Sequence, residues 1–186
     1  MEPSRAHPQV TLELTEVSPD DADEITAFRR EFPVGRMQAT PDPDCIPGLD
    51  GLERFSGAEE WLRYTGEMKG KITWYLSRRP GEKSIVGCLC LRHALEYDDD
   101  DPEFASHIGY SVRPSLQGRG YGREQLRLGL EKAGALGLRR VRLICRDTNL
   151  PSSRAILANG GVPVDSICGE DSGLRVIRYD IVLEKN

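Results

Sequence analysis

The chain has 186 residues, with 25 lysines and arginines against 30 aspartates and glutamates, so its formal net charge is −5. This length fits one domain, expected over residues 10–186, and the acidic balance argues against a general nucleic-acid binder, which carries a basic surface. The sequence shows no apolar run typical of a signal peptide and none approaching the ~20 residues of a membrane span. We therefore expect a cytoplasmic protein without membrane partners.

The cysteine content predicts reduced thiols and no metal site. The five cysteines are Cys45, Cys88, Cys90, Cys145 and Cys168. They include no C-x-x-C pair of the kind that holds zinc or carries out redox exchange. Cys88 and Cys90 lie two apart in an apolar run, so a strand would place both on one face. Core packing is the favoured role there and metal binding is the alternative.

The N-terminal part predicts a strand followed by a helix. Residues 1–9 are polar and contain proline, so we expect them to fray. Apolar and polar residues alternate from Val10 to Leu14, as in a half-buried strand. Pro19 and the two aspartates after it indicate the start of a helix that runs to Phe32.

The next segment predicts a long loop, a helix and a hairpin. From Pro33 to Asp50 the sequence is rich in proline, glycine and aspartate without a steady period. Ser56 and Glu59 have the spacing of a capping box ahead of a helix. Two β-prone runs, Ile72 to Leu76 and Ser84 to Arg92, flank a turn signal and predict an antiparallel hairpin.

An acidic run from Asp98 to Asp101, with Glu103 close by, precedes the second half of the chain. Such runs repel themselves and are usually solvated loops. The alternative is that this run attracts a cationic amine substrate.

The second half alternates strands and helices. A strand with apolar residues at every second position from Ile108 stops at Pro114, and a glycine-rich turn leads into a long helix that Gly137 ends. The apolar residues of this helix recur at helical spacing. They are Leu126, Leu130, Ala133 and Leu136. We then expect a strand from Val141 to Cys145, a helix from Pro151 to Ala158 ended by Gly160 and Gly161, and a closing strand from Arg175 to Leu183.

The glycine-rich turn is the strongest functional signal. Gly118, Gly120 and Gly122 would let backbone approach a ligand closely, and the helix N-terminus behind them presents unpaired N–H groups to an anion. We therefore predict a pyrophosphate cradle at this turn. The spacing fits neither a P-loop nor the G-x-G-x-x-G fingerprint, so a nucleotide-binding protein is the least favoured interpretation.

The residues around this turn resemble the acyl-CoA motif of the GNAT superfamily of N-acyltransferases, Gln/Arg-x-x-Gly-x-Gly/Ala. Gln117, Gly120 and Gly122 match it, and the segments Asp147-Thr148-Asn149 with Ser153 and Asn159-Gly160-Gly161 are similar to the family's next strand, helix and turn. The resemblance covers roughly the second half of the chain, with weaker likeness in 85–93 and 178–179. The segments V-I-R-Y-D-I and L-R-H are similar to one uncharacterised branch of predicted acetyltransferases.

The resemblance implies an α/β fold with a central, mostly antiparallel sheet that is splayed in the middle and has helices on both faces. Acetyl-CoA, as co-substrate, would lie in the splay. The implied cofactor-binding residues are Tyr110, Ser111, Val112, Gln117, Gly118, Arg119, Gly120, Tyr121, Gly122, Asn149 and Ser153. Asn149 is equally well read as a helix N-cap, and the two roles are compatible. Arg119, Arg123 and Arg127 form a solvated basic face or, for the first two, contact phosphate.

The implied reaction is N-acetyl transfer to a primary amine by direct attack in a ternary complex. The tyrosine that often acts as general acid in this family aligns with Ile156, and a carboxylate base found in some members aligns with Ile144; neither isoleucine can move a proton. The remaining candidates are His93, His107 and Glu96 as bases and Tyr179 as acid. Each also has a structural interpretation, Tyr179 as a core residue, and a base-free route through water stays open.

Because of the two isoleucines, a non-catalytic acyl-CoA-binding or sensing module is the alternative function. The expected acceptor is a small-molecule or peptide amine, and a protein tail, an antibiotic, a polyamine and a free amino acid all stay open, as does a homodimer. No motif in the sequence identifies the acceptor.

Overall fold

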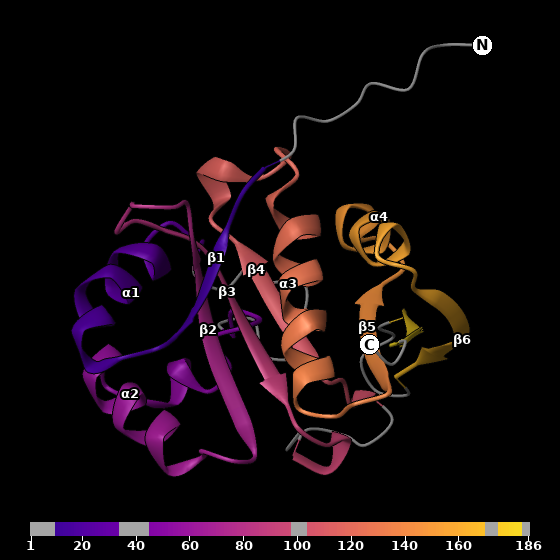
Figure 1. Cartoon of the computed structure of the whole chain (residues 1–186), viewed down its shortest axis with the longest axis horizontal. Helices are drawn as coiled ribbons and strands as arrows, with labels where there is room; N and C mark the ends of the chain where they lie inside the picture. The colour runs from indigo at the N-terminus through magenta and orange to yellow at the C-terminus, as the bar shows by residue number, and fades with distance from the viewer. Residues whose placement is uncertain (1–9, 34–44, 98–103, 170–174, 184–186) are drawn as a thin grey trace.

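The computed structural model describes residues 10–33, 45–97, 104–169 and 175–183. These ranges contain seven β-strands and four α-helices (Figure 1). The segment expected to fray, the acidic run and most of the long loop after Pro33 lie outside the described residues.

The first sheet is antiparallel and contains the predicted hairpin. In sheet order its strands are β1 (Glu13–Glu16), β2 (Ile72–Arg78), β3 (Ile85–Arg92) and β4 (Ile108–Val112). Trp74 of β2 lies opposite Cys90 of β3, and Leu89 of β3 lies opposite Tyr110 of β4. β1 begins later than the alternation from Val10 predicts, although Leu12 is buried.

The second sheet includes a strand that was not predicted. Its order is β5 (Arg140–Arg146), β7 (Arg175–Val182) and β6 (Val162–Cys168), and both pairings are antiparallel. β6 forms one edge, and most of its side chains are exposed. Without a buried face it lacks a clean alternation of apolar and polar residues, and Pro163 argues against a strand.

The helices divide between the two faces of the first sheet (Figure 1). α1 (Ala22–Arg29) and α2 (Ala58–Glu67) cover one face, α3 (Tyr121–Ala135) covers the other, and α4 (Leu150–Ala158) packs on α3 and β5. Strand alternation separates the two cores: Cys88 and Cys90 of β3 point toward α1 and α2, whereas Leu89 points toward α3. The predicted core packing of the two cysteines is confirmed.

One helix boundary differs from its prediction, and another agrees with it. Ser56 donates from its N–H and its hydroxyl to Glu60, at 3.1 and 2.6 Å, and not to Glu59; Gly57 is the N-cap of α2. The capping box was therefore placed on the wrong carboxylate. In α3, Gly137 follows the helix end with a φ of +88°, as predicted, but Leu136 lies beyond the last buried turn and is 47% exposed.

A buried glutamine attaches α3 to the first sheet. Gln125 is fully buried; its amide donates to the carbonyl of Cys88 and its Oε1 accepts the Ser77 hydroxyl at 3.2 Å. Gly87 makes room for it, because a Cβ there would lie 2.2 Å from Oε1. The amide fixes the height of α3 over β2 and β3, and so the position of its N-terminus.

The two sheets separate between β4 and β5. They are joined at His107, whose N–H donates to the carbonyl of Arg142 at 2.9 Å, while the Arg142 N–H donates to Nδ1 of His107 at 2.9 Å. Beyond His107, β4 pairs with β3 and β5 pairs with β7. The predicted fold, a mostly antiparallel sheet splayed in the middle with helices on both faces, is confirmed.

Candidate functional site

The glycine-rich turn connects the end of β4 to the start of α3. Gly118 and Gly120 have φ values of +76° and +88°, a left-handed conformation that only glycine adopts at little cost, and Gly120 is the N-cap of α3. The first N–H groups of a helix have no intrahelical acceptor, and its dipole favours negative charge there. The turn therefore has the geometry expected of an anion site, and its binding of a pyrophosphate stays a prediction.

The turn is held against β4 by short contacts. A Cβ on Gly122 would lie 3.6 Å from the side chains of both Tyr110 and Val112, so the first turn of α3 packs directly on the α3 face of β4. The Gln117 side chain donates to the carbonyl of Val112 at 3.1 Å and closes the loop between strand and helix. Gln117 thus shapes the turn from within.

Arg113 supports the same turn from behind, a role that the sequence reasoning missed. Its Nη1 lies 2.6 Å from the Glu31 carboxylate and its Nε donates to the carbonyl of Ile85 at 2.6 Å. The Ser115 hydroxyl also donates to Glu31, at 2.7 Å. That hydrogen bond and the guanidinium hold the pKa of Glu31 below its usual range. The link connects the end of α1 to the turn.

The three arginines of α3 and the turn differ in their partners. Arg127 pairs with Glu124 at 2.8 Å and also with Glu131, as expected for a solvated charged face. Arg119 is exposed, with one long hydrogen bond to the Ser115 carbonyl at 3.4 Å, and Arg123 is exposed too. Arg119 and Arg123 therefore stay the candidates for phosphate contact.

A cluster of hydroxyl and thiol groups, here called the hydroxyl cluster, spans the gap between β4 and β5. It consists of Tyr110, Cys145, Ser152, Ser153 and Tyr179. The hydroxyls of Tyr110 and Ser152 share a hydrogen bond of 3.3 Å, and those of Ser153 and Tyr179 share one of 2.9 Å. Burial raises the pKa of the Cys145 thiol, and the neighbouring hydroxyls of Ser152 and Tyr179 oppose that rise. Burial raises the pKa of Tyr110 to about 12, so its phenol keeps its proton at neutral pH.

Asn149 begins α4 and orients the hydroxyl cluster. Its Oδ1 accepts the N–H of Ser152 at 3.2 Å, so its N-cap role is confirmed, while its bond to the cofactor stays a prediction. The sequence reasoning selected Ser153 but not its neighbour Ser152, which reaches Tyr110 across the gap. Adjacent serines in the first turn of a helix point in different directions, and sequence alone does not show which one faces the gap.

His107 sits at the junction of the sheets with its one acceptor nitrogen engaged. A backbone N–H can only donate, so the Arg142 contact requires Nδ1 to be unprotonated and places the ring proton on Nε2. Burial, followed by the charge of Arg142, lowers the pKa of His107. While this bond holds, the neutral ring has no free lone pair to take a proton.

His93 lies at the other end of the sheet from the glycine-rich turn. It follows β3, whose C-terminal end pairs with the start of β4, and its Nε2 shares a hydrogen bond of 2.9 Å with the Thr73 hydroxyl. β4 separates it from the gap in the strand order. Glu96 lies in an exposed 3-10 turn nearby. The structure therefore brings Tyr110, Ser153 and Tyr179 together at the gap and leaves His93 apart.

Comparison with known families gives one match over most of the chain. A family profile described as an acetyltransferase (GNAT) domain matches residues 11–162. The chain belongs to the GNAT acetyltransferase family. It is therefore an acyltransferase. A search of curated protein sequences found no match.

Solved GNAT structures share the fold. RimL, a ribosomal L7/L12 α-N-protein acetyltransferase in complex with coenzyme A, superposes with a TM-score of 0.72 at 18% identity, covering 97% of this chain and 99% of its own. RimJ of Mycobacterium smegmatis with CoA-disulfide gives 0.69 at 18% identity, covering 93% and 82%. A chimera of spermidine N-acetyltransferase SpeG from Vibrio cholerae and hSSAT gives 0.65 at 16%, covering 92% and 95%.

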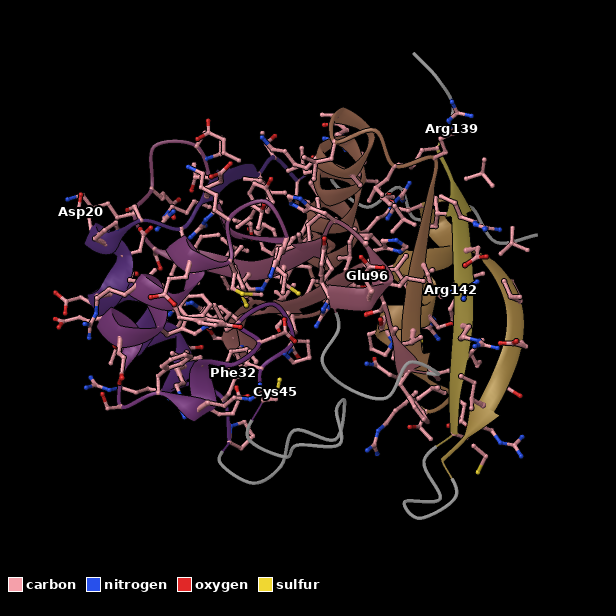
Figure 2. All side chains as sticks on the ribbon, turned by 90° about the horizontal axis from the view of Figure 1, so that it is seen from below. Asp20, Phe32, Cys45, Glu96, Arg139 and Arg142 are labelled. Atoms are coloured by element: carbon pink, nitrogen blue, oxygen red, sulfur yellow. The ribbon has the colours of Figure 1, made fainter. Side chains whose placement is uncertain are left out.

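On the other face of β4, this GNAT protein carries a tightly packed loop. Gly48 has a φ of +95°, and a Cβ there would lie 2.5 Å from the carbonyl oxygen of Cys88. Two residues later, Asp50 lies over Gly109 of β4. Figure 2 shows Cys45, at the start of this described segment, on the half that carries α1 and α2, and Arg142 on the second sheet. The sequence reasoning assigned the whole region to a loop and missed Asp50.

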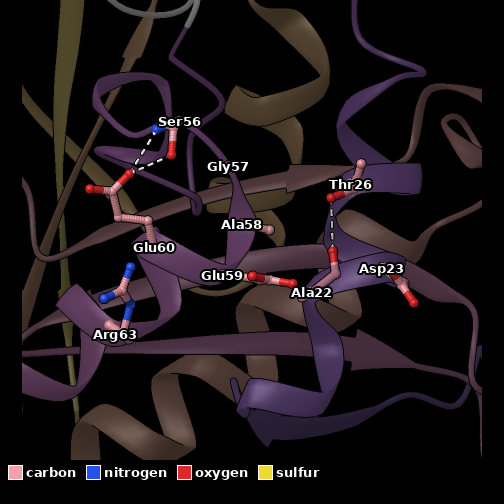
Figure 3. Close-up of a pocket in the computed structure, with 9 residues that line it drawn as sticks. All are labelled: Ala22, Asp23, Thr26, Ser56, Gly57, Ala58, Glu59, Glu60 and Arg63. Carbon is pink, nitrogen blue, oxygen red and sulfur yellow. Dashed lines mark hydrogen bonds between the residues drawn. The ribbon is translucent and has the colours of Figure 1, made fainter.

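A separate hollow between α1 and α2 has acidic walls (Figure 3). Its volume is about 360 Å³, and Asp23, Glu59, Glu60 and Arg63 are among its lining residues. It contains no residue of the glycine-rich turn. Its carboxylates would repel a diphosphate, so it is not where a CoA-type anion would bind.

The described residues contain no group of three His, Cys, Asp or Glu side chains placed to hold a metal ion. Their helices are too short or too polar to cross a membrane.

Proposed function

We propose that the protein transfers the acetyl group of acetyl-CoA to a primary amine, by direct attack of the amine on the thioester while both are bound. The observation that carries the proposal is that the glycine-rich turn follows a strand, β4, whose pairing with β5 is interrupted. The turn follows the C-terminal end of β4, and β4 runs along the gap away from its junction at His107.

The backbone of β4 is suited to hold the arm of the cofactor. From Ile108 to Val112 this strand pairs with β3 on one side, while its other edge faces the gap and not a β5 ladder. An edge with unpaired N–H and C=O groups is a template for an extended ligand. Backbone groups of Tyr110, Ser111 and Val112 would bond the pantetheine, and the amides of 118–122 would bond the diphosphate. RimL and RimJ were each solved with a CoA species, which supports this placement.

The leaving thiolate needs a proton, and the hydroxyl cluster can supply one. Tyr179 is 2% exposed, and its hydroxyl shares a hydrogen bond of 2.9 Å with that of Ser153. We propose Tyr179 as the general acid, replacing the tyrosine that this family often carries at the position of Ile156. Positioned general acids contribute typically 10²–10⁴-fold to rate.

The attacking amine must be neutral. A lysine-like amine has a pKa of ~10.4 in water, so it loses a proton before it attacks. His107 would have to break its bond with Arg142 to accept that proton, and His93 lies away from the gap. We therefore favour transfer to water, with proximity and the β4 backbone N–H groups supplying most of the acceleration.

The proposal is tested by acetyl transfer itself. Acetyl-CoA binding is measured by calorimetry, and CoA release is followed with a thiol reagent in the presence of spermidine, a peptide with an N-terminal serine, and lysine. We expect binding and amine-dependent CoA release, with mass spectrometry showing an acetylated amine. Tight binding without turnover of any amine would instead favour the acyl-CoA-sensing alternative, and no binding would reject both.

A further inference from the structure

We propose that the carboxylate of Asp50 binds the ammonium group of the acceptor, on the face of β4 opposite the cofactor turn. This assignment rests on the proposed function, because it concerns the second substrate of the same site. It selects acceptors that are cationic at neutral pH, such as alkylamines and peptide N-termini, over arylamines.

The first observation is the close approach of Asp50 to β4. A Cβ on Gly109 would lie 3.4 Å from Oδ2 of Asp50 and 3.1 Å from the sulfur of Cys90. The glycine therefore lets a carboxylate oxygen lie against the strand backbone. Gly109 is two residues beyond His107, on the part of β4 that no longer pairs with β5, and its partner in β3 is Cys90.

The second observation is that the carboxylate is held in place. Oδ2 accepts the N–H of Gly48 at 3.1 Å, and the backbone carbonyl of Asp50 accepts the indole N–H of Trp61 at 3.2 Å. The preceding loop is fixed to the sheet, because the hydroxyl of Ser111 donates to the carbonyl of Pro47. A binding group needs such support to act at a defined position.

The third observation is that the two faces of β4 contact different parts of the molecule. Tyr110 and Val112 point toward α3, where Gly122 of the cofactor turn packs on them. Gly109 and Ser111 alternate with them and point toward the loop that carries Asp50. A cofactor entering from the α3 face leaves the opposite face for the amine, and Asp50 places a negative charge there.

A purely structural role for Asp50 is the rival explanation, since a buried arginine needs a counterion. Arg92 is 7% exposed and its Nη2 lies 3.5 Å from Oδ1 of Asp50, longer than a good charge-assisted hydrogen bond. Arg92 also donates to the carbonyl of Ser106, at 3.4 Å. Oδ1 of Asp50 also accepts the Cys45 thiol at 3.8 Å. The Asp50 side chain stays 24% exposed, and a carboxylate has about four lone pairs, so it can accept one donor beyond Gly48, Arg92 and Cys45.

The test uses Asp50→Asn, which keeps the shape and an acceptor for the Gly48 N–H but removes the charge. With spermidine and the N-terminal serine peptide as acceptors, we expect kcat/KM for the amine to fall by about 10–100-fold, the loss typical of one charge-assisted contact. The KM for acetyl-CoA and the calorimetric affinity for it should stay at the wild-type values. Asp20→Asn, which removes an exposed charge elsewhere, is the matched control and should behave as wild type.

Each outcome decides the assignment. If Asp50→Asn and Asp20→Asn have equal amine kcat/KM values, or if the parameters for acetyl-CoA and amine deteriorate together, Asp50 is a structural counterion and the assignment is wrong. If circular dichroism shows that Asp50→Asn is unfolded, Asp50→Glu decides, because it keeps the charge for Arg92 and displaces the oxygens; the same selective loss is expected. Absence of wild-type turnover with every amine overturns the proposed function, and the assignment with it.

Discussion

His107 and Arg142 join the two sheets through a reciprocal pair of hydrogen bonds, one from backbone to backbone and one from backbone to imidazole, each 2.9 Å long. No ladder follows these two bonds. One of the two bonds at the closed end of the gap therefore depends on the His107 imidazole, whose Nδ1 can accept a hydrogen bond only when it is unprotonated.

The first prediction is a loss of stability in mild acid. Because burial lowers the pKa of His107, its contribution to stability is fully present above the unfolded-state pKa of ~6.5 and is lost as pH falls below that value toward the folded-state pKa. We expect the melting temperature to fall between pH 7 and 5. His107→Asn keeps an acceptor for the Arg142 N–H and does not titrate, so its melting temperature should depend less on pH. Parallel curves for the two proteins would contradict the prediction.

The second prediction concerns Gly120. A valine there would adopt the left-handed conformation at a cost of roughly 1–2 kcal/mol, and its side chain would stand at the N-cap of α3, where the proposed cradle binds the diphosphate. Gly120→Val should abolish acetyl-CoA binding in calorimetry while far-UV circular dichroism stays native. Gly81→Val places the same side chain at a φ of +75° in the β2–β3 turn and controls for strain alone. Wild-type affinity in Gly120→Val would argue strongly against the proposed cradle.

The third prediction separates the two phenols of the hydroxyl cluster. Tyr179→Phe should lower kcat by about 10²-fold or more if Tyr179 protonates the thiolate, with little change in the KM for acetyl-CoA. Tyr110→Phe removes a hydroxyl bonded to Ser152 at the same gap and should have a smaller effect. Single-turnover rates of the two variants are compared. If Tyr110→Phe loses as much rate as Tyr179→Phe, or more, the general acid is Tyr110 or Ser152 and not Tyr179.

The fourth prediction tests the histidines as bases. Neither His93→Ala nor His107→Asn should remove a limb of the profile of kcat/KM against pH, since His93 bonds Thr73 away from the gap and Nδ1 of His107 is engaged. Loss of a limb in one variant only would identify that histidine as the base. The profiles should be recorded where both variants remain folded.

The fifth prediction is a stability effect at Gln125. Gln125→Leu has a similar volume but leaves the Ser77 hydroxyl and the Cys88 carbonyl without this partner, a cost of about 1–3 kcal/mol in the free energy of unfolding. Ser77→Ala removes only the shared hydroxyl and should cost less. Urea denaturation measures both, and a neutral Gln125→Leu would show that α3 does not depend on this amide.

Much of the fold was predictable because most of its elements have one buried face. The hairpin of β2 and β3, the strand before the glycine-rich turn and the helix ended by Gly137 all follow from periodicity and turn residues. β6 was missed because it is an edge strand with few buried side chains. The capping of α2 was displaced by one residue because Glu59 and Glu60 both lie within reach of Ser56 in the sequence.

Some features of the candidate site could likewise be predicted from the sequence, and others could not. The conformation of the glycine-rich turn was predictable, since left-handed glycines at Gly118 and Gly120 leave a local signature. The contacts of Asp50 and Ser152 were not, because they depend on which β4 residues lie opposite them in the fold, and such contacts have no signature in one sequence. The same holds for His107, whose engagement by Arg142 depends on where two sheets separate.

The ion pair between Arg113 and Glu31 couples two parts of the chain that lie far apart in the sequence. Glu31, just beyond the C-terminal end of α1, holds both Arg113 and Ser115, so the end of α1 and the glycine-rich turn are linked. A displacement of one is therefore expected to shift the other. If a ligand at the turn and a ligand at α1 both favour the same arrangement of this link, each strengthens the binding of the other by the same factor.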